Sequence, residues 1–455
     1  MHIDVPEVIE PATALGRVHF VGIGGAGLSA IARLMAQQGI AVSGSDAQDS
    51  VVLQALRAEG IDARVGHDPA RLIGVDTVVA TTAVREDNPE IVEAQRLGLR
   101  LWPRSAGLQS VLLAGRTVAV AGTHGKTTTT AMLTCALRGA GSDPSFAIGA
   151  EVPSLGTNAA WGTSGDVVAE ADESDGAFLV YTPHGAVVTN VDADHLDQWG
   201  TPEAYAAAFD GFADTISPDG FLVCVVDDPG AAALAERHRT LGRRVVTVST
   251  RADSGADVGP DALAGVTLWS PGDHYLADAL AALATGLALG LDRAALAAGL
   301  AAYTGTKRRM EPKGEAGGVR VYDSYAHHPV EIAGDLQSGR ALAGEGRLVV
   351  AFQPHLVSRT RIFGEAMGQA LGAADEVVLT DVYLAREEAD PDITAAYVAR
   401  SVPLPADRVA VVPDLDDLAG ELARRARPGD LVLTLGAGTI TTVGPRVLEL
   451  LRDHG

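Results

Sequence analysis

Residues 117–129 read Thr-Val-Ala-Val-Ala-Gly-Thr-His-Gly-Lys-Thr-Thr-Thr and contain the groups that bind a phosphate. An apolar run leads into a loop bounded by Gly122 and Gly125, and Lys126 and Thr127 then open a helical stretch. The loop N–H groups and the positive end of the helix dipole attract an anion. Lys126 can neutralise β- and γ-phosphate oxygens, and the Thr127 hydroxyl can bind Mg²⁺. We therefore predict a nucleoside triphosphate site; a capped helix with a solvated lysine is the structural alternative.

Two acidic motifs follow later apolar runs. Residues 170–175 place four carboxylates within the span Glu-Ala-Asp-Glu-Ser-Asp. Their mutual repulsion is reduced beside a divalent cation, and hard oxygen ligands suit Mg²⁺, so we predict Glu173 as a ligand. In residues 189–197 His195 stands among three aspartates and can bind a second Mg²⁺ or a phosphate oxygen. A solvated acidic turn and a structural histidine are the respective alternatives.

A second glycine-rich loop lies near the N-terminus. Residues 22–27 read Gly-Ile-Gly-Gly-Ala-Gly between a predicted strand and the helical stretch Leu28–Gln38. They fit the G-x-G-x-x-G pattern, and Asp46 ends the next strand. Any diphosphate favours such a loop, so a nucleotide diphosphate is our first interpretation, beside a nicotinamide cofactor or a purely structural turn. Asp46 can hold a ribose hydroxyl or serve as a turn acid.

Three motifs in the last third of the chain carry cations and imidazoles. Residues 307–311, Lys-Arg-Arg-Met-Glu, offer cations for a γ-phosphate or form an exposed linker. Residues 323–329 combine an acid, a phenol and two imidazoles before a proline. In residues 352–361, His355 and Arg359 can bind a carboxylate, because arginine recognises planar anions through paired hydrogen bonds. A core histidine with a surface arginine is the alternative.

The elements that position these motifs repeat along the chain. Short apolar runs, each ended by polar or glycine residues, alternate with helical stretches. They lie at residues 18–24, 41–46, 77–82, 117–122, 166–170, 185–190, 220–226, 245–249, 347–353, 375–381, 409–412 and 430–436. Continuous apolar strands alternating with helices predict parallel sheets covered on both faces. Ligands bind such sheets beyond the carboxyl ends of the strands, where the polar clusters stand.

Composition narrows the class of protein. A length of 455 residues suggests about three domains. The formal charge of −23 argues against nucleic acid as a partner. Cys135 and Cys224 give no disulfide framework. We see no signal peptide and no apolar run of about 18 residues, so we predict a cytoplasmic protein without a membrane span.

These motifs resemble, in order from about Val18 to Gly438, the Mur ligase family, whose members build the peptide of bacterial cell-wall precursors. The phosphate loop and the Glu-Ser-Asp and Asp-His-Leu-Asp motifs carry the resemblance. It implies an α/β fold of three domains. These are a Rossmann-like UDP-binding domain over 1–114, a central P-loop ATPase domain with a mostly parallel sheet over 115–311, and a C-terminal Rossmann-like α/β domain that binds the amino acid over 312–455.

The resemblance also implies an activity. The Gly-rich loop, Asp-Ser-Tyr-Ala-His-His-Pro and Phe-Gln-Pro-His are most similar to members that use ATP and Mg²⁺ to attach L-alanine to the carboxylate of UDP-N-acetylmuramate through an acyl phosphate. A site shared by three domains implies closure when ligands bind. We expect a monomer or a weak homodimer. A ligase that recycles murein peptides or adds a later residue, a nicotinamide oxidoreductase and a nucleotide-binding regulator stay as alternatives.

The resemblance assigns roles by position. ATP binding falls to Gly122, Thr123, His124, Gly125, Lys126, Thr127, Thr128, Asp278, Arg309 and Asp323. Mg²⁺ binding falls to Thr127, Glu173 and His195. UDP-sugar binding falls to Gly22, Gly24, Gly25, Gly27, Asp46, Thr81, Asn88, Thr157 and Asn158, the last two in a segment, residues 156–159, that is similar to the family's sugar-contacting loop. Amino-acid binding falls to Tyr325, His327, His355 and Arg359. Catalysis falls to Lys126, His195, Arg309, His327 and Arg359.

The sequence departs from the family pattern at three places. The family's His-Asn-x-x-Asn reads His274-Tyr-Leu-Ala-Asp278, and Asp278 can accept from the adenine N6 amine but cannot donate to N7. After Phe-Gln-Pro-His, residues 356–357 are Leu-Val where the family often has Arg-Tyr. No lysine lies between Lys126 and Lys307, so we predict that the carbamylated lysine of several relatives is absent.

Overall fold

The computed structural model describes residues 3–81, 84–385 and 387–453 of the chain. The chain forms two compact units. The first unit comprises Met1–Thr267 and Ala277–Tyr303, and the second unit comprises Leu268–Leu276 and Thr304–Gly455. Among the described residues, the first unit contains two sheets and the second unit one.

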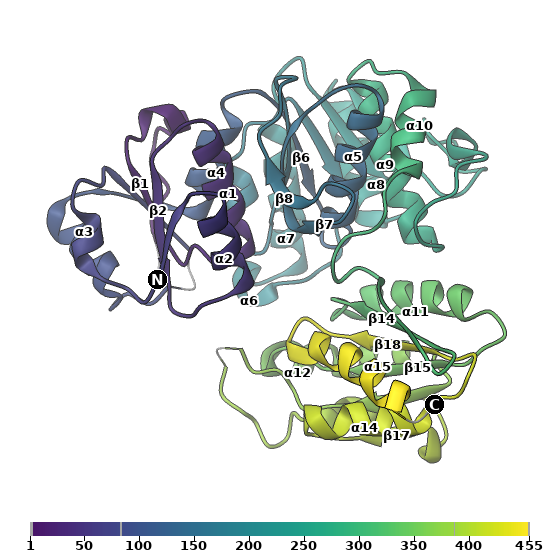
Figure 1. The fold of residues 1–455 in the computed structure, drawn as a ribbon. Helices are drawn as coiled ribbons and strands as arrows, with labels where there is room; N and C mark the ends of the chain where they lie inside the picture. The colour runs from purple at the N-terminus through teal and green to yellow at the C-terminus, as the bar shows by residue number, and fades with distance from the viewer. Residues whose placement is uncertain (1–2, 82–83, 386, 454–455) are drawn as a thin grey trace. The chain divides into compact units, whose positions relative to one another are not determined.

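The N-terminal sheet of the first unit is parallel throughout, in the order β3-β2-β1-β4-β5. Its strands are β1 (Val18–Val21), β2 (Val42–Asp46), β3 (Asp62–Val65), β4 (Thr77–Ala80) and β5 (Arg100–Pro103). Its helices are α1 (Ala26–Gln37), α2 (Val51–Ala58), α3 (Pro89–Leu97) and α4 (Arg104–Leu112), with the 3₁₀ turns η1 (Ala12–Ala14) and η2 (Pro69–Leu72). Helices α1 and α2 cover one face and α3 the other (Figure 1). The strand order reverses between β1 and β4, which is where such sheets bind ligands.

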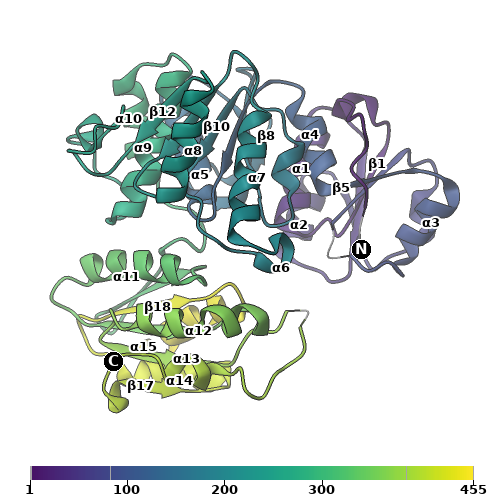
Figure 2. The ribbon, with the colours of Figure 1, turned by 180° about the vertical axis from the view of Figure 1, so that it is seen from behind.

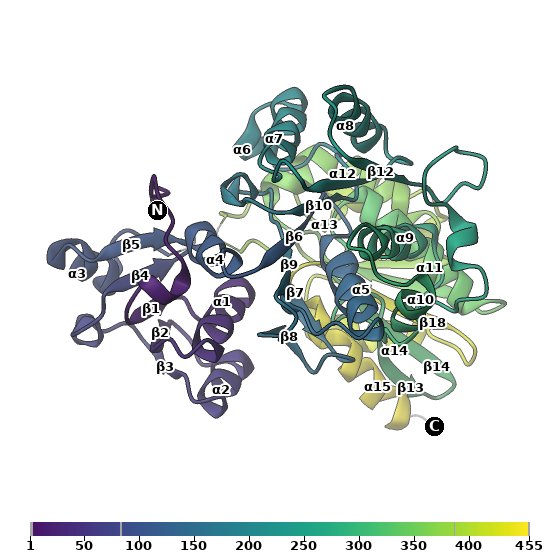
Figure 3. The same cartoon turned by 90° about the horizontal axis from the view of Figure 1, so that it is seen from above.

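The central sheet has the order β12-β11-β10-β6-β9-β7-β8, parallel except for the hairpin β7–β8. Its strands are β6 (Arg116–Ala121), β7 (Ser145–Val152), β8 (Thr157–Ala160), β9 (Asp166–Glu170), β10 (Gly185–Val188), β11 (Phe221–Val225) and β12 (Val245–Val248). Its helices are α5 (Lys126–Gly139), α6 (Leu196–Trp199), α7 (Pro202–Asp214), α8 (Pro229–Thr240), α9 (Asp273–Ala288) and α10 (Arg293–Ala301), with η3 (Ala177–Val180) and η4 (Pro260–Leu263). Helices α5, α9 and α10 lie on one face and α7 and α8 on the other (Figure 3). The first turn of α9 belongs to the second unit.

The two sheets of the first unit share one hydrophobic core, which runs from the β1 side to the β10 side. Helix α1 packs on β7 and β8, and α4 packs on η3. The Asn158 side chain, buried on β8, accepts from Arg33 Nη1 at 2.8 Å and lies 3.4 Å from Ala26 O. The start of α1, just after the first glycine loop, is thereby fixed to the central sheet.

The second unit is built on a sheet of order β13-β14-β18-β15-β16-β17, parallel except for the hairpin β13–β14. Its strands are β13 (Glu311–Ala316), β14 (Val319–Ser324), β15 (Leu348–Phe352), β16 (Glu376–Leu379), β17 (Val409–Val411) and β18 (Leu431–Leu435). Its helices are α11 (Pro329–Ala343), α12 (Val357–Leu371), α13 (Ala395–Ala399), α14 (Leu415–Arg425) and α15 (Val443–Asp453), with η5 (Ala406–Arg408) and η6 (Thr439–Thr442). Helix α11 packs beside α12, and α14 packs beside α15 (Figure 2).

The three sheets confirm the predicted three-domain α/β fold. Two hairpins were not predicted. The predicted sugar-contacting segment, residues 156–159, is part of one of them, because Thr157 begins β8. The end of the predicted run 77–82 lies outside the described residues. Domain limits after residues 114 and 311 stay predictions. Among the described helices, none combines the length and the apolar character that a membrane crossing needs.

Candidate active site

The phosphate loop connects β6 to α5 through four residues whose backbone leaves little room. Gly122 has φ 138° and Gly125 has φ 82°, values that favour glycine. A Cβ on Gly122 would lie 1.9 Å from Thr189 Oγ1, and one on Gly125 would lie 2.6 Å from Asp278 Oδ1. The loop therefore closes against the end of β10 and against the second turn of α9. Asp278 also accepts from Thr129 Oγ1 at 2.8 Å, so its carboxylate lies beside the loop.

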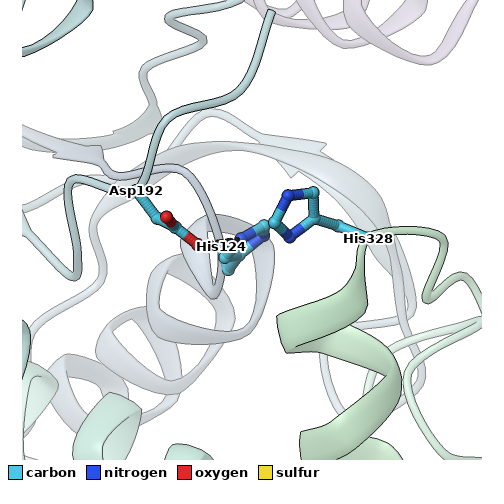
Figure 4. A group of neighbouring side chains, drawn as sticks. All are labelled: His124, Asp192 and His328. Atoms are coloured by element: carbon cyan, nitrogen blue, oxygen red, sulfur yellow. Dashed lines mark ion pairs between the residues drawn. The ribbon is translucent and has the colours of Figure 1, made fainter. Parts of the chain in front are cut away.

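Residues after β10 hold this loop by hydrogen bonds. The His124 N–H donates to Asn190 Oδ1 at 2.8 Å. Thr123 Oγ1 lies 2.8 Å from both Asp192 O and the Tyr205 hydroxyl. The His124 ring points toward the Asp192 carboxylate, and His124 Nε2 lies 3.7 Å from Asp192 Oδ2 (Figure 4). The loop is thus held in place before any ligand binds.

Lys126 is directed inward by the loop. Its Nζ donates to Gly122 O at 2.6 Å and to Thr123 O at 3.0 Å, and it lies 2.8 Å from Glu173 Oε2. Burial opposes the charge of Lys126, but Glu173 and Asp172 outweigh it and raise the pKa of the ammonium. Lys126 is therefore a permanent cation at the loop, as neutralisation of a phosphate requires.

The acidic motif divides its carboxylates between different partners. Glu170 accepts from Thr127 Oγ1 at 3.0 Å and from Gly149 N at 2.7 Å. Burial raises the pKa of Glu173 to about 7, with Lys126 opposing the shift and Asp172 adding to it. The predicted Mg²⁺ ligand Thr127 therefore lies beside Glu170 rather than Glu173. Glu170 was not among the predicted ligands, although its place as the last residue of β9 is a usable signal.

His195 occupies a distinct position after β10. It precedes α6 with φ 50°, a left-handed conformation that is uncommon outside glycine. Its Nε2 lies 3.6 Å from Asp194 Oδ2, and its N–H donates to Asp194 Oδ1 at 2.8 Å. Such strained residues occur often at functional sites, and the role of His195 stays a prediction.

The first glycine loop is supported by one of its own predicted ligand residues. Asp46 Oδ2 accepts from Gly24 N at 2.9 Å, so this acid holds the loop. A Cβ on Gly22 would lie 3.6 Å from Thr81 Cγ2, which places Thr81 at the loop. Asn88 caps α3 by accepting from Glu90 N at 2.9 Å. The structure thus brings Gly22, Gly24, Asp46 and Thr81 together, and it gives Asn88 and Asn158 contacts within the protein.

Arg104 links this loop to the acidic motif. A Cβ on Gly27 would lie 3.2 Å from Arg104 Cδ. Arg104 Nη2 donates to Asp172 Oδ2 at 3.0 Å and lies 3.4 Å from Asp175 Oδ2. Burial opposes ionisation of Asp172, but Arg104 and Lys126 lower the pKa of its carboxyl to about 2. The sequence alone gave no signal for Arg104.

In the second unit, Asp323 is a fully buried acid at the end of β14. Its Oδ1 accepts from Thr434 Oγ1 at 2.6 Å, and its Oδ2 accepts from Thr441 Oγ1 at 2.7 Å. Arg308 Nε lies 3.5 Å from Asp323 Oδ2. A predicted ribose contact of Asp323 would therefore compete with hydroxyl donors that the protein itself supplies.

The basic motif forms a strained turn against an aromatic ring. Arg308 has φ 59° and Met310 has φ 46°. The guanidinium carbons of Arg308 and Arg309 lie 4.9 and 5.0 Å from the ring centroid of Tyr325, within range of cation–π attraction. Arg308 also donates to the carbonyls of Gly436, Ala437 and Gly438. Arg309 was predicted, whereas Arg308, its neighbour in the same motif, was missed.

Three predicted amino-acid-binding residues form one cluster in the second unit. The ring centroids of Tyr325 and His327 lie 5.3 Å apart, and those of His327 and His355 lie 5.7 Å apart. Burial, followed by the charges of His327 and Arg359, lowers the pKa of His355 to about 4. His355 is therefore neutral near pH 7 and can donate or accept a hydrogen bond. Arg359 is buried on α12.

Known proteins are similar to this chain over nearly its whole length. Sequence models described as "Mur ligase family, catalytic domain", "Mur ligase middle domain" and "Mur ligase, glutamate ligase domain" match residues 17–116, 120–285 and 308–438. The chain is 71% identical over 451 residues to a UDP-N-acetylmuramate–L-alanine ligase of Nocardioides sp., covering 99% of this chain and 100% of that protein.

Several solved structures resemble the chain, including the following two. The UDP-N-acetylmuramate–alanine ligase of Thermotoga maritima is 28% identical with a TM-score of 0.79, covering 96% of this chain and all of that one. A murein peptide ligase of Psychrobacter arcticus is 23% identical with a TM-score of 0.69, covering 96% of this chain and 99% of that one. The second likeness concerns the fold alone.

Proposed function

Because the chain belongs to the Mur ligase family, we propose that it joins L-alanine to the carboxylate of UDP-N-acetylmuramate, with cleavage of ATP to ADP and phosphate. Members of this family are ATP-dependent ligases that form an amide bond. The observation that carries the proposal is the 71% identity to a UDP-N-acetylmuramate–L-alanine ligase over the whole length of both chains. The murein-peptide-recycling alternative rests on solved structures that are 23% and 27% identical to this chain.

The reaction proceeds in two balanced steps. An oxygen of the muramoyl carboxylate attacks the γ-phosphorus of ATP, the bond to ADP breaks, and an acyl phosphate forms. The L-alanine amine then attacks the acyl carbon, the C–N bond forms, and inorganic phosphate leaves as the amine loses its proton. Both steps concentrate negative charge on a phosphoryl group, so fixed cations provide the main stabilisation.

In the first unit, we assign the ATP phosphates to the loop Gly122–Thr128, in which Thr123, His124 and Gly125 form the turn before α5. The Thr123 and His124 N–H groups donate to Asn190 in the unliganded loop. Lys126 neutralises the phosphoryl oxygens, and Asp278 lies at the loop for an adenine contact. Thr127, Glu173 and His195 stay the proposed Mg²⁺ ligands, and Glu170 joins them because its carboxylate binds Thr127. A hydroxyl and carboxylates form a hard oxygen set that fits Mg²⁺, which supplies charge neutralisation when bound.

We assign the UDP-sugar to the first glycine loop. Gly22, Gly24, Gly25 and Gly27 leave backbone space for the diphosphate, and Asp46 and Thr81 lie at the same loop. The roles of Asn88, Thr157 and Asn158 are proposed as indirect, since Asn88 caps α3 and Asn158 fixes the start of α1.

In the second unit, we assign the amino acid to Tyr325, His327, His355 and Arg359, the γ-phosphoryl charge to Arg309, and the ATP ribose to Asp323. The clustering of three of these rings supports the assignment. Because the proposed substrates are nucleotides, we propose a cytoplasmic location. The proposed partners are small molecules, and no nucleic acid is among them. A monomer or weak homodimer stays our proposal for the assembly, and sedimentation equilibrium tests it.

One incubation tests the proposed function. The full chain is mixed with ATP, Mg²⁺, UDP-N-acetylmuramate and one amino compound at a time, and phosphate release is measured. Release that requires both the sugar and L-alanine is the expected result. Release only with a murein tripeptide would replace this function with the recycling one. Tight nucleotide binding without turnover would identify a regulator.

A further inference from the structure

Four aromatic rings meet beyond the carboxyl ends of the strands in the second unit. Tyr325 and His327 follow β14, His355 follows β15, and Tyr383 follows β16. The rings of His355 and Tyr383 are stacked, with centroids 5.7 Å apart and planes inclined by 13°. Tyr383 is the member of this cluster that has no role in the proposed function.

The backbone fixes Tyr383 to the loop that carries His355. Tyr383 N donates to Pro354 O at 2.8 Å, and Tyr383 O accepts from Leu356 N at 2.9 Å. The two hydrogen bonds form an isolated parallel bridge between His355 and Tyr383. Leu356, the next residue, adopts φ 67°, an unfavourable backbone conformation for a residue other than glycine. The stack is thus set by the backbone and not by rotamer choice alone.

Tyr383 is also confined by the turn after β18. A Cβ on Gly438 would lie 2.6 Å from Tyr383 Cγ and 2.5 Å from Gln353 Oε1. Only glycine fits at this position without displacing the phenol ring. Tyr383 is therefore wedged between the His355 ring and the Gly438 backbone, and it cannot move away to admit a larger group.

His355 presents a polar atom without a protein partner. Its Nδ1 is buried and has no hydrogen-bond partner among the residues that the structure describes. Leaving such an atom unsatisfied is unfavourable, so a water molecule or a bound ligand is its expected partner. The planes of the His327 and His355 rings are inclined by 78°, so His327 contacts His355 edge to face. Tyr383 is the ring that stacks on a face of the His355 ring.

We propose that Tyr383 is a specificity-determining residue for the amino-acid substrate: by stacking on His355 and abutting Gly438, its ring restricts the bound side chain to about the size of a methyl group. The inference rests on the proposed function and adds the size limit to it. A pocket that rejects one extra methylene typically discriminates by about 10–200-fold.

The test compares Tyr383→Ala and Tyr383→Phe in the full chain, with phosphate release measured at saturating ATP, Mg²⁺ and UDP-N-acetylmuramate. The values of kcat/KM are determined for L-alanine, L-serine and L-2-aminobutyrate. We expect Y383A to lower the preference for L-alanine over L-2-aminobutyrate about tenfold or more, while KM for ATP changes little. Y383F, which keeps the ring, is expected to preserve the preference.

Tyr397 provides the matched control. It lies on α13 in the same unit, where a Cβ on Gly364 would meet its ring at 2.7 Å. Y397A removes a ring of the same size away from the His355 cluster, so its preference should equal that of the wild type. If Y383A does not fold, Y383L provides the same comparison.

An equal loss for every amino acid in Y383A, with the preference unchanged, would overturn the inference while leaving the proposed function intact. A wild-type protein that releases no phosphate with L-alanine would contradict the proposed function, and the inference with it.

Discussion

Lys126 Nζ lies 2.8 Å from Glu173 Oε2, so the lysine of the phosphate loop is paired with an acid that follows β9, the strand next to its own. The same Nζ donates to two carbonyls of its loop. The ammonium of Lys126 is thereby held at the loop before a phosphate binds. When a triphosphate binds, its oxygens have to replace these protein oxygens as partners of the ammonium.

Replacing Lys126 by alanine should reduce turnover by about 10²–10³-fold or more, because a fixed charge that stabilises the phosphoryl transition state is lost. Binding of UDP-N-acetylmuramate, measured by calorimetry, should change little, since the proposed sugar site lies on the other sheet of the first unit. Lys313→Ala is the control, because Lys313 pairs with Glu311 on β13. Near-native phosphate release by K126A would show that the triphosphate does not bind at this loop.

Glu170→Gln should raise the Mg²⁺ concentration needed for half-maximal turnover by about 10–100-fold, the usual effect of weakening a metal-site neighbour. The reason is the hydrogen bond that Glu170 accepts from Thr127 at 3.0 Å. Asp166→Asn, at the opposite end of the same strand and paired with Arg116, should leave the Mg²⁺ requirement unchanged. An E170Q requirement equal to that of the wild type would exclude Glu170 from the metal site.

Arg104→Gln should lower the free energy of unfolding by about 1–3 kcal/mol, because the hydrogen bonds of a mostly buried arginine to Asp172 and Asp175 are lost. Urea denaturation measures the change. Arg116→Gln is the matched control: its ion pair with Asp166 is half exposed on the arginine side, so its loss should cost less than about 1 kcal/mol. Equal costs for the two variants would show that the Arg104 link contributes no more to stability than a half-exposed ion pair.

Asp335 should make stability depend on pH in the second unit. Burial raises the pKa of this carboxyl to about 7, with Glu331 adding to the shift and the Ser324 hydrogen bond and Arg309 opposing it. His274 Nε2, 3.7 Å away, also faces it. The folded state then binds more protons than the unfolded state between pH 3.8 and about 7, so this group's contribution to stability falls as pH rises through that window.

Asp335→Asn removes that titration. The unfolding free energy of D335N relative to wild type should therefore rise between pH 5 and pH 8, by about 1–4 kcal/mol. Ser324→Ala keeps the titrating carboxyl and should retain the pH dependence of the wild type. A difference between D335N and wild type that stays constant across this range would show that Asp335 is ionised at both pH values.

The repeated features of this chain were predictable from sequence, and the long-range contacts were not. Apolar runs ended by polar residues located the parallel strands, because a strand buried on both faces needs continuous apolar residues. The two hairpins were missed since β8 and β13 carry polar or small residues without such a run. Asn88 was assigned to a ligand, although Asn before Pro is also typical of a helix N-terminus.

Pairing across the sheets is the part that sequence could not provide. Arg104 meets Asp172 over 68 residues and Arg33 meets Asn158 over 125 residues, and no local pattern encodes either partner. The pairing of Thr127 with Glu170 depends likewise on β6 and β9 being neighbours. The motifs therefore identified the residues whose types can do chemistry. The order of the strands decides which of these residues lie close together in the fold.

The most direct test of the ligase account follows the oxygen atoms of the muramoyl carboxylate. UDP-N-acetylmuramate labelled with ¹⁸O in that carboxylate is converted with ATP, Mg²⁺ and L-alanine, and the released phosphate is examined by mass spectrometry. We expect one ¹⁸O atom in each phosphate, because the oxygen that attacks the γ-phosphorus leaves with it. Unlabelled phosphate, formed together with the amide product, would contradict an acyl-phosphate route.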